Sequence, residues 1–303
     1  MKINSIYVVG AGAIGASYAA KLYDMNPESV TIIANEKRCE KYKKGIKVNG
    51  KEYFFQTVIP EKVKEKADFI IVAVKNHHLS EAMRNIEKAV GKNTIIMSLL
   101  NGISSEDILG EKFGIERLVY SMCVGIDAVR IENETKYSNI GKIFFGEKTN
   151  IDLSNKVQDI KDIFERAEIP YIIPENMIKK LWWKFMINTG INQISAVLRV
   201  PYGVLKKDEN ATQLLERTMK EVIEISKYEG INLNNEDYEE WLRILNNLSD
   251  EGKTSMLQDV EAGRKTEVEL FAGTIVKLAE KHNIRTPMNE ILLKMISVLE
   301  GEI

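Results

Sequence analysis

The chain has 303 residues and carries 42 Lys and Arg against 44 Asp and Glu, which gives a formal net charge of −2. This length favours two domains, and the balanced charge argues against nucleic acid or an anionic membrane as a partner. The apolar runs are far shorter than the ~20 residues of a membrane span, and no cleavage-site pattern follows the first of them, so we expect a cytoplasmic protein.

Short β-branched runs alternate with amphipathic helical stretches through the first half of the chain. Four of these runs are apolar almost throughout, as strands buried on both faces are; they cover residues 6–9, 30–34, 69–74 and 94–99. Further strands are expected at 118–125 and 143–146, and helices over 15–23 and 79–89. The alternation predicts a parallel sheet covered by helices.

Strand-like runs stop at a segment that contains two prolines, Pro170 and Pro174. From there to the end the apolar spacing is helical, over residues 178–198, 210–229, 237–246, 255–263, 266–282 and 288–299. The predicted fold class is therefore α/β, with a parallel-sheet domain over residues 1–170 followed by an all-helical C-terminal domain over residues 171–303.

A glycine-rich turn follows the first predicted strand and opens the first helix. It reads Gly10, Ala11, Gly12, Ala13, Ile14, Gly15, which is the GxGxxG pattern of dinucleotide-binding sites. The first glycine allows a tight turn, the second lets the backbone approach a pyrophosphate, and the third lets helix and strand pack closely. The helix N-terminus adds unpaired N–H groups for the phosphates. These features predict a Rossmann-type nucleotide domain.

The residues after the second predicted strand bear on the choice between NAD and NADP. An acid at this point accepts hydrogen bonds from the ribose of NAD, but the chain has Asn35, with Lys37 and Arg38 close behind it. A neutral amide followed by two cations fits the 2′-phosphate of NADP(H) better. Glu36 keeps NAD open as the alternative, and a charge cluster at a strand end is also typical of a solvated face.

Two polar residues follow the third and fourth predicted strands. Lys75 ends one strand, and Asn101 precedes Gly102 after the next. Both lie where open α/β sheets bind ligands, so we expect them to face the same crevice. A surface lysine and an ordinary turn are the structural alternatives.

Neither the histidines nor the cysteines show the spacing of a metal site. His77 and His78 have no third ligand in view, and Cys39 and Cys123 stand far apart without a CxxC pairing. We expect no bound metal, solvent-facing histidines at a helix start, and unreactive thiols in a reducing compartment.

The predicted helix over 178–198 carries a polar stripe. At 100° per residue, Lys184, Asn188, Asn192 and Ser195 fall within about 80° of one another, whereas Phe185 and its apolar neighbours lie elsewhere. A solvated face would usually carry Glu, Lys and Arg, and Asn is a poor helix former. The stripe therefore favours a polar site that faces a ligand cleft.

A second polar cluster runs from Thr254 through Asp259 to Glu267. Thr254 or Ser255 could cap a helix, and Glu267 could begin the next one. The pattern alone leaves these structural roles and a functional role equally open.

Taken together, these motifs resemble the ketopantoate reductase (2-dehydropantoate 2-reductase) family over essentially the whole chain. The resemblance rests on GAGAIG at residues 10–15, on Val74-Lys75 and Asn101-Gly102, on WWKFMINTGINQISA at residues 182–196, and on TSMLQDVEAGRKTE at residues 254–267. The last two segments are specific, whereas many unrelated dehydrogenases share the glycine motif.

The resemblance implies that NADPH and ketopantoate meet in a cleft between a Rossmann domain and a helical domain. It assigns Lys184 as the general acid that protonates the carbonyl oxygen, and Glu267 as an acid bordering the cofactor and the active site. The implied substrate-binding residues are Asn101, Asn188, Asn192, Ser255 and Tyr202. The implied cofactor-binding residues are Gly10, Ala11, Gly12, Ala13, Ile14, Gly15, Asn35, Lys37, Arg38, Lys75, Asn101 and Glu267.

The chain departs from the family pattern at positions that bear on specificity. Tyr202 stands where certain members place a substrate-binding Asn, and the second strand lacks the Arg often found there for the 2′-phosphate. A reductase of another branched 2-oxo acid therefore remains the alternative, as does a catalytically silent dinucleotide sensor, although a pure sensor has no use for Lys184. Relatives include dimers and the helical half offers surface for a homodimer, but the sequence leaves the oligomeric state open.

Overall fold

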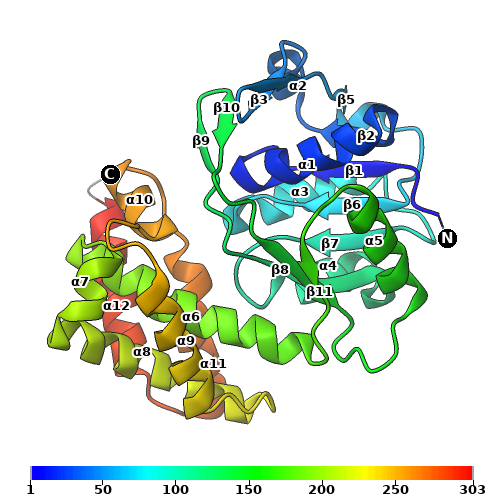
Figure 1. Cartoon of the computed structure of the whole chain (residues 1–303). Coiled ribbons are helices and arrows are strands. Elements are labelled where there is room, and N and C mark those ends of the chain that lie inside the picture. Colours follow the sequence, from blue (N-terminus) through cyan, green and yellow to red (C-terminus); the bar gives the residue numbers. More distant parts are fainter. Residues whose placement is uncertain (1, 302–303) are drawn as a thin grey trace. The chain divides into compact units, whose positions relative to one another are not determined.

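The computed structural model describes residues 2–301, and the chain forms two compact units that divide between Ile178 and Lys179 (Figure 1). The first unit is α/β and the second is helical, which confirms the predicted fold class. The expected boundary after residue 170 differs from this division because Tyr171–Ile172 forms a strand, β12, that pairs with the sheet of the first unit. No helix within residues 2–301 is long and apolar enough to cross a bilayer.

The main sheet of the first unit has eight strands in the order β12-β11-β8-β7-β6-β1-β2-β5. Their bounds are β1 (Ile6–Val9), β2 (Val30–Ile33), β5 (Gln56–Val58), β6 (Phe69–Val72), β7 (Ile95–Ser98), β8 (Leu118–Val124), β11 (Lys142–Gly146) and β12. The six predicted strands are confirmed, and β5 and β12 are additional. The pairing is parallel except that β11 runs antiparallel to β8. The sheet is therefore mixed, whereas the sequence predicted a parallel sheet.

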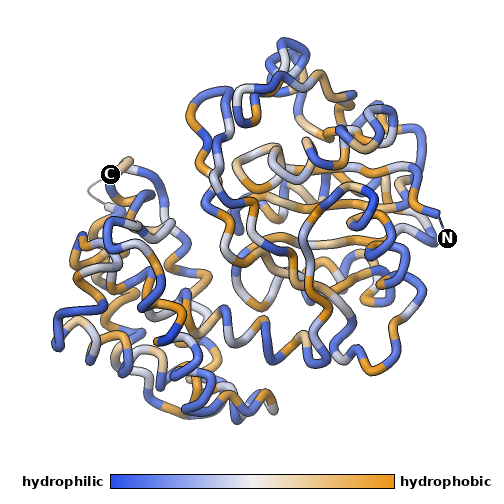
Figure 2. Tube along the Cα trace, in the orientation of Figure 1, coloured by the Kyte–Doolittle hydropathy of each residue, from blue (hydrophilic) through white to orange (hydrophobic). Residues whose placement is uncertain are grey.

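Helices cover both faces of this sheet. They are α1 (Ala13–Met25), α2 (Glu36–Tyr42), α3 (Leu79–Ile86), α4 (Ser105–Phe113) and α5 (Asn155–Arg166). Successive side chains of β1 enter two different cores: Val8 belongs to the cluster that contains residues of α1 and α5, and Val9 to the cluster that contains residues of α3 and α4. Figure 2 shows the resulting concentration of hydrophobic residues along the central strands.

A second, four-stranded sheet in the first unit was not expected. It joins two short hairpins in the order β4-β3-β10-β9, with β3 (Ile46–Val48), β4 (Lys51–Tyr53), β9 (Val129–Ile131) and β10 (Glu134–Lys136). The hairpins pair through β3 and β10, which run parallel although they are far apart in sequence. Helix α1 contacts both of these strands.

The second unit is built from helices, as predicted. They are α6 (Met177–Leu198), α7 (Tyr202–Lys207), α8 (Glu209–Tyr228), α9 (Asn235–Asn247), α10 (Ser255–Glu261), α11 (Thr274–His282) and α12 (Pro287–Gly301). The single helix expected over 266–282 is wrong in its first part, because a π-helical turn, Glu269–Gly273, precedes α11. This turn packs on α6 through Phe271, whose ring centroid lies 6.3 Å from that of Phe185.

Candidate active site

The glycine-rich turn connects β1 to α1 and depends on two of its glycines. Gly10 has a φ of +96°, and a Cβ there would lie 2.4 Å from the carbonyl oxygen of Ala73. A Cβ on Gly15 would lie 2.0 Å from the carbonyl oxygen of Gly10. A Cβ on Gly12 would meet nothing within 4 Å, so this backbone stays open to approach. Gly12 begins α1 without a side-chain cap, which leaves the first N–H groups of the helix available to an anion.

A cavity lies beside this turn within the first unit. Gly10 and Ala11 line it from the turn, and Asn35, Arg38 and Tyr42 from the segment that follows β2. Lys37 is exposed and is not among the lining residues. The structure thus brings Asn35 and Arg38 to the cavity beside the dinucleotide turn, but it does not bring Lys37 there.

Asn35 has a structural use that the sequence analysis did not assign. Its Oδ1 accepts a hydrogen bond from the backbone N–H of Arg38 at 3.0 Å and so caps α2. This cap fixes the backbone of Arg38 at the start of the helix. The guanidinium of Arg38 is therefore attached to an ordered first turn of α2.

The same cavity is also lined by residues that were not predicted as site residues. His78 and Glu81 line it, and His78 Nδ1 lies 3.8 Å from Glu81 Oε2. His77 and His78 are exposed in a short helical turn, Asn76–His78, just before the start of α3, as expected. A lone histidine at a helix start carries no spacing signal, so only the structure shows that His78 also borders this cavity.

Lys75 and Asn101 lie at the carboxyl ends of neighbouring strands. Lys75 begins the helical turn after β6, and Asn101 follows β7 just before Gly102, whose φ is +89°. Because β6 pairs in parallel with both β1 and β7, the two residues lie at the same edge of the sheet as the glycine turn. Both side chains are half-buried.

The polar stripe on α6 is not a solvated face. Lys184 and Asn188 are half-buried, and Asn192 is only 5% exposed. Ser195 is fully buried, and its hydroxyl donates a hydrogen bond to the carbonyl of Val200 at 2.6 Å. Ser195 therefore secures the end of the helix, and the stripe that can meet a ligand consists of Lys184, Asn188 and Asn192.

The second polar cluster combines structural and accessible residues. Thr254 caps α10, since its Oγ1 accepts a hydrogen bond from Leu257 N at 3.1 Å. Ser255, the first residue of that helix, is exposed. Glu267 lies two residues before the π-helical turn, and its carbonyl accepts a hydrogen bond from Leu270 N at 2.9 Å, while its side chain is half-buried.

Tyr202 lies next to the segment that leads into α10. Its backbone N–H donates to the carbonyl of Gly252 at 2.9 Å, and a Cβ on Gly252 would lie 2.7 Å from the ring. Burial raises the pKa of Tyr202, so its phenol is neutral at physiological pH and can donate a hydrogen bond.

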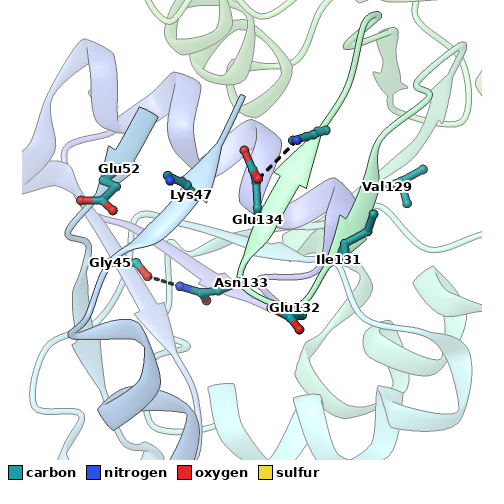
Figure 3. A pocket seen from close by; sticks show the side chains of 9 residues that line it. Gly45, Lys47, Glu52, Val129, Ile131, Glu132, Asn133 and Glu134 are labelled. Atoms are coloured by element: carbon teal, nitrogen blue, oxygen red, sulfur yellow. Dashed lines mark hydrogen bonds and ion pairs between the residues drawn. The ribbon is translucent and has the colours of Figure 1, made fainter. Parts of the chain in front are cut away.

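A further cavity, on the four-stranded sheet, has no predicted site residue among those that line it (Figure 3). Asn133 from one hairpin donates a hydrogen bond to the carbonyl of Gly45 at 2.6 Å. Lys136 and Glu134 form an ion pair at 3.5 Å. Asn133 thus links the two hairpins, and Glu134 and Lys136 pair within β10. Within residues 2–301, no group of three His, Cys, Asp or Glu side chains could hold a metal ion.

The arrangement can serve two kinds of chemistry. The first unit offers an uncapped helix N-terminus and a cation, Arg38, around one cavity, which suits a dinucleotide phosphate. The second unit offers an ammonium, Lys184, in line with two carboxamides, which suits an anionic oxygen-rich substrate. A half-buried ammonium can also donate a proton to an oxygen that gains negative charge.

Comparison with known proteins places nearly the whole chain in one sequence family. Residues 6–150 match the family described as "Ketopantoate reductase PanE/ApbA", and residues 176–300 match "Ketopantoate reductase PanE/ApbA C terminal". Among curated proteins, the chain is 28% identical to a 2-dehydropantoate 2-reductase from Pyrococcus abyssi, with 98% of this chain and 99% of the relative aligned.

Solved structures share the fold. A dimeric ketopantoate reductase from Staphylococcus aureus aligns with a TM-score of 0.84 at 20% identity, over 98% of this chain and 99% of that one. A D-mandelate dehydrogenase, solved with NADH and anilino(oxo)acetate, aligns with a TM-score of 0.88 at 22% identity over the same shares of the two chains.

Proposed function

Because this chain belongs to the ketopantoate reductase family, we propose that it catalyses the NADPH-dependent reduction of 2-dehydropantoate to pantoate, a step of pantothenate and coenzyme A biosynthesis. The observation that carries the proposal is the stripe of Lys184, Asn188 and Asn192 on α6, which is too buried to be an ordinary solvated helix face. Such a row of one ammonium and two carboxamides matches the charge and hydrogen-bonding groups of a hydroxylated 2-oxo acid.

The first unit fits a nicotinamide dinucleotide. The open backbone at Gly12 and the uncapped start of α1 would hold the pyrophosphate through N–H groups. Arg38, which lines the adjoining cavity, would bind the 2′-phosphate, with Asn35 beside it and Lys37 adding positive charge nearby. Lys75, Asn101 and Glu267 would lie toward the nicotinamide. A bound nicotinamide dinucleotide supplies the hydride.

Lys184 would act at the oxygen of the substrate ketone. Negative charge builds on that oxygen as the C–O bond loses its double character, and an ammonium both stabilises the charge and donates the proton. Asn188, Asn192, Ser255 and Tyr202 would bind the carboxylate and hydroxyl of the substrate and so fix the ketone beside Lys184.

A reductase of a different 2-oxo acid is the second candidate. Tyr202 supports it, because this chain has a phenol where some family members place a smaller amide. The structural neighbour solved with anilino(oxo)acetate has the same fold, so the fold accommodates an aromatic oxo acid. The two candidates share the cofactor and the role of Lys184 and differ only in the side chain that the substrate carries.

A panel assay tests the proposal. NADPH and NADH oxidation would be followed with ketopantoate, 2-oxoisovalerate, 2-oxoisocaproate, phenylglyoxylate and pyruvate, and the products identified by chiral chromatography with mass spectrometry. We expect the highest kcat/KM with ketopantoate and NADPH. A higher value with another 2-oxo acid would favour the second candidate, whereas NADPH binding without turnover on any acid would indicate a sensor.

A further inference from the structure

Glu106 is a buried carboxylate at the start of α4. Its side chain is 2% exposed, and within residues 2–301 it forms no ion pair with a lysine or arginine. It accepts hydrogen bonds from the hydroxyl of Ser105 at 2.8 Å and from the backbone N–H of Ser121, on β8, at 3.2 Å. A buried acid with only neutral partners is costly to maintain, so this position calls for an explanation.

A chain of hydrogen bonds leads from this carboxylate to the backbone beside Asn101. The hydroxyls of Ser105 and Ser98 lie 2.7 Å apart. Ser98, the last residue of β7, accepts a hydrogen bond from the backbone N–H of Leu100 at 3.4 Å, and its own carbonyl accepts one from the hydroxyl of Ser121. The network therefore ties the residues on both sides of the loop over 99–104 to β8.

We propose that Glu106 is a positioning residue that sets the conformation of the loop over 99–104 and thereby orients Asn101 at the carboxyl edge of the sheet. The ladder between β7 and β8 includes Ile96 with Leu118 and Met97 with Val119, and Ser121 lies beyond these pairs. There the carboxylate of Glu106 receives the N–H of Ser121 in place of a strand partner. The proposal rests on the proposed function, in which Asn101 lies near the nicotinamide.

The protonation state of Glu106 would act on the same loop. Burial raises its pKa to about 7, with a smaller contribution from Asp107 on the same helix. Strand β8 carries two titratable side chains, Cys123 and Tyr120, and burial raises the pKa of Tyr120 to about 12. Glu147 adds to that rise, and the ammonium of Lys148 lies 5.8 Å from the centre of the Tyr120 ring. Strand β7 contributes no titratable side chain.

Protonation reverses the direction of two hydrogen bonds, the one between Glu106 and the Ser105 hydroxyl and the one between the Ser105 and Ser98 hydroxyls. The N–H of Ser121 can only donate, so a proton on the carboxyl group must be donated to the hydroxyl of Ser105. That hydroxyl must then donate to Ser98, the residue that receives the N–H of Leu100. The reversal of these hydrogen bonds thus reaches the partner of Leu100, the residue before Asn101.

A double-mutant cycle tests this role. Glu106→Gln, Asn101→Ala and the double variant would be compared with the wild type for kcat and KM, with Glu111→Gln, an exposed carboxylate on the same helix, as the control. We expect Glu106→Gln to lower kcat roughly 10- to 100-fold, as a small misplacement of a reacting group does. The double variant should be no slower than Asn101→Ala, and Glu111→Gln should match the wild type. An equal loss from Glu106→Gln in both backgrounds would overturn the proposal.

The pH profile gives a second readout that a purely structural role would not move. The wild-type kcat should titrate near pH 7, and this titration should be absent from Glu106→Gln and from Asn101→Ala. Ser98→Ala interrupts the series of hydrogen bonds between Glu106 and Leu100 but leaves both hydrogen bonds of Glu106 intact. It should therefore also abolish the titration of kcat near pH 7. It provides the test should Glu106→Gln fail to fold. A titration that persists in Ser98→Ala or Glu106→Gln contradicts the proposal.

The proposed function and the role of Glu106 can fail separately. If the wild-type enzyme reduces no 2-oxo acid, the proposed function is refuted. The double-mutant cycle then uses the NADPH dissociation constant, measured by fluorescence, in place of kcat. A non-additive effect of Glu106→Gln and Asn101→Ala on that constant still supports positioning through Asn101. Additive effects overturn it.

Discussion

Lys184 is the residue at which charge and proton donation can be separated. Lys184→Ala removes both, and we expect kcat to fall about 10²–10⁴-fold. Lys184→Arg keeps the positive charge, but a guanidinium barely releases its proton, so kcat should also fall while KM changes less. Steady-state kinetics of both variants make the comparison.

The matched control for Lys184 is Lys180→Ala, one turn earlier on α6. Its ammonium lies 3.4 Å from Glu240 and 5.0 Å from the centre of the Trp183 ring. It therefore has a structural partner of its own, and its loss should leave kcat unchanged. Near-normal turnover by Lys184→Arg would remove Lys184 from the role of proton donor.

Arg38 and Lys37 are a natural pair for testing cofactor choice. Arg38 lines the cavity beside the glycine turn and Lys37 does not. Arg38→Glu should move the NADPH to NADH ratio of kcat/KM toward NADH by roughly 10- to 100-fold, since a charge-assisted hydrogen bond is worth about 1.5–3 kcal/mol. Lys37→Glu should shift the same ratio much less. Equal shifts in the two variants would mean that general charge, and not contact, decides the preference.

The sequence predicted the site best where periodicity constrains side chains. The spacing of Lys184, Asn188 and Asn192 placed them on one face of a helix, and all three are at least half-buried. Ser195 shares that face, but its hydroxyl is used by the carbonyl of Val200, a contact that no helical pattern encodes. Glu106 was not predicted as a site residue, because its sequence position shows only an acid in the first turn of a helix, and its hydrogen bond to β8 is a tertiary contact that no helical pattern encodes.

At the scale of elements, the turn between β1 and α1 offers two glycines with opposite roles. A Cβ on Gly15 would clash with the backbone of Gly10 at 2.0 Å, whereas a Cβ on Gly12 would meet nothing. Gly15→Ala should therefore destabilise the fold by about 1–3 kcal/mol. Gly12→Ala should leave stability unchanged but weaken NADPH binding roughly tenfold or more, about 1.4 kcal/mol.

Thermal unfolding and NADPH fluorescence titration measure these two effects on the same preparations. Gly15→Ala should show a lower Tm, and Gly12→Ala a wild-type Tm with a higher dissociation constant. A wild-type dissociation constant for Gly12→Ala would argue against a pyrophosphate at this turn.

Elements were predictable from sequence when their pattern was long or fully apolar. Strands β1, β2, β6 and β7 are buried on both faces, so their runs were continuous and easy to recognise. Strands β3, β4, β9 and β10 have three residues each, which is too short to show alternation. Helix α2 was not predicted, because its sequence is mostly charged and shows no apolar spacing. The π-helical turn was not predicted either, because it changes the helical period within a stretch whose composition is that of an ordinary helix.

At the scale of the whole molecule, the two compact units should respond differently to the cofactor. NADPH in excess should slow amide hydrogen exchange over residues 10–15 and at the start of α2, because binding suppresses local opening. Helices α8 and α12, which carry no predicted cofactor residue, should exchange at their unliganded rates. Mass spectrometry of peptic fragments resolves these segments, and Gly12→Ala provides the control. Equal slowing in α8 and α12 would contradict a cofactor site built mainly by the first unit.

The pairing of β3 with β10 has a consequence for synthesis on the ribosome. Hairpin β3–β4 emerges long before β10, so the edge of β3 that pairs with β10 in the finished protein stays open in the nascent chain, beside the apolar side chains of Ile46 and Val48. An open strand edge with apolar side chains invites association with other chains. Chaperone crosslinking at Val48 should therefore be strong in chains stalled before residue 129 and should weaken once residue 136 has left the exit tunnel.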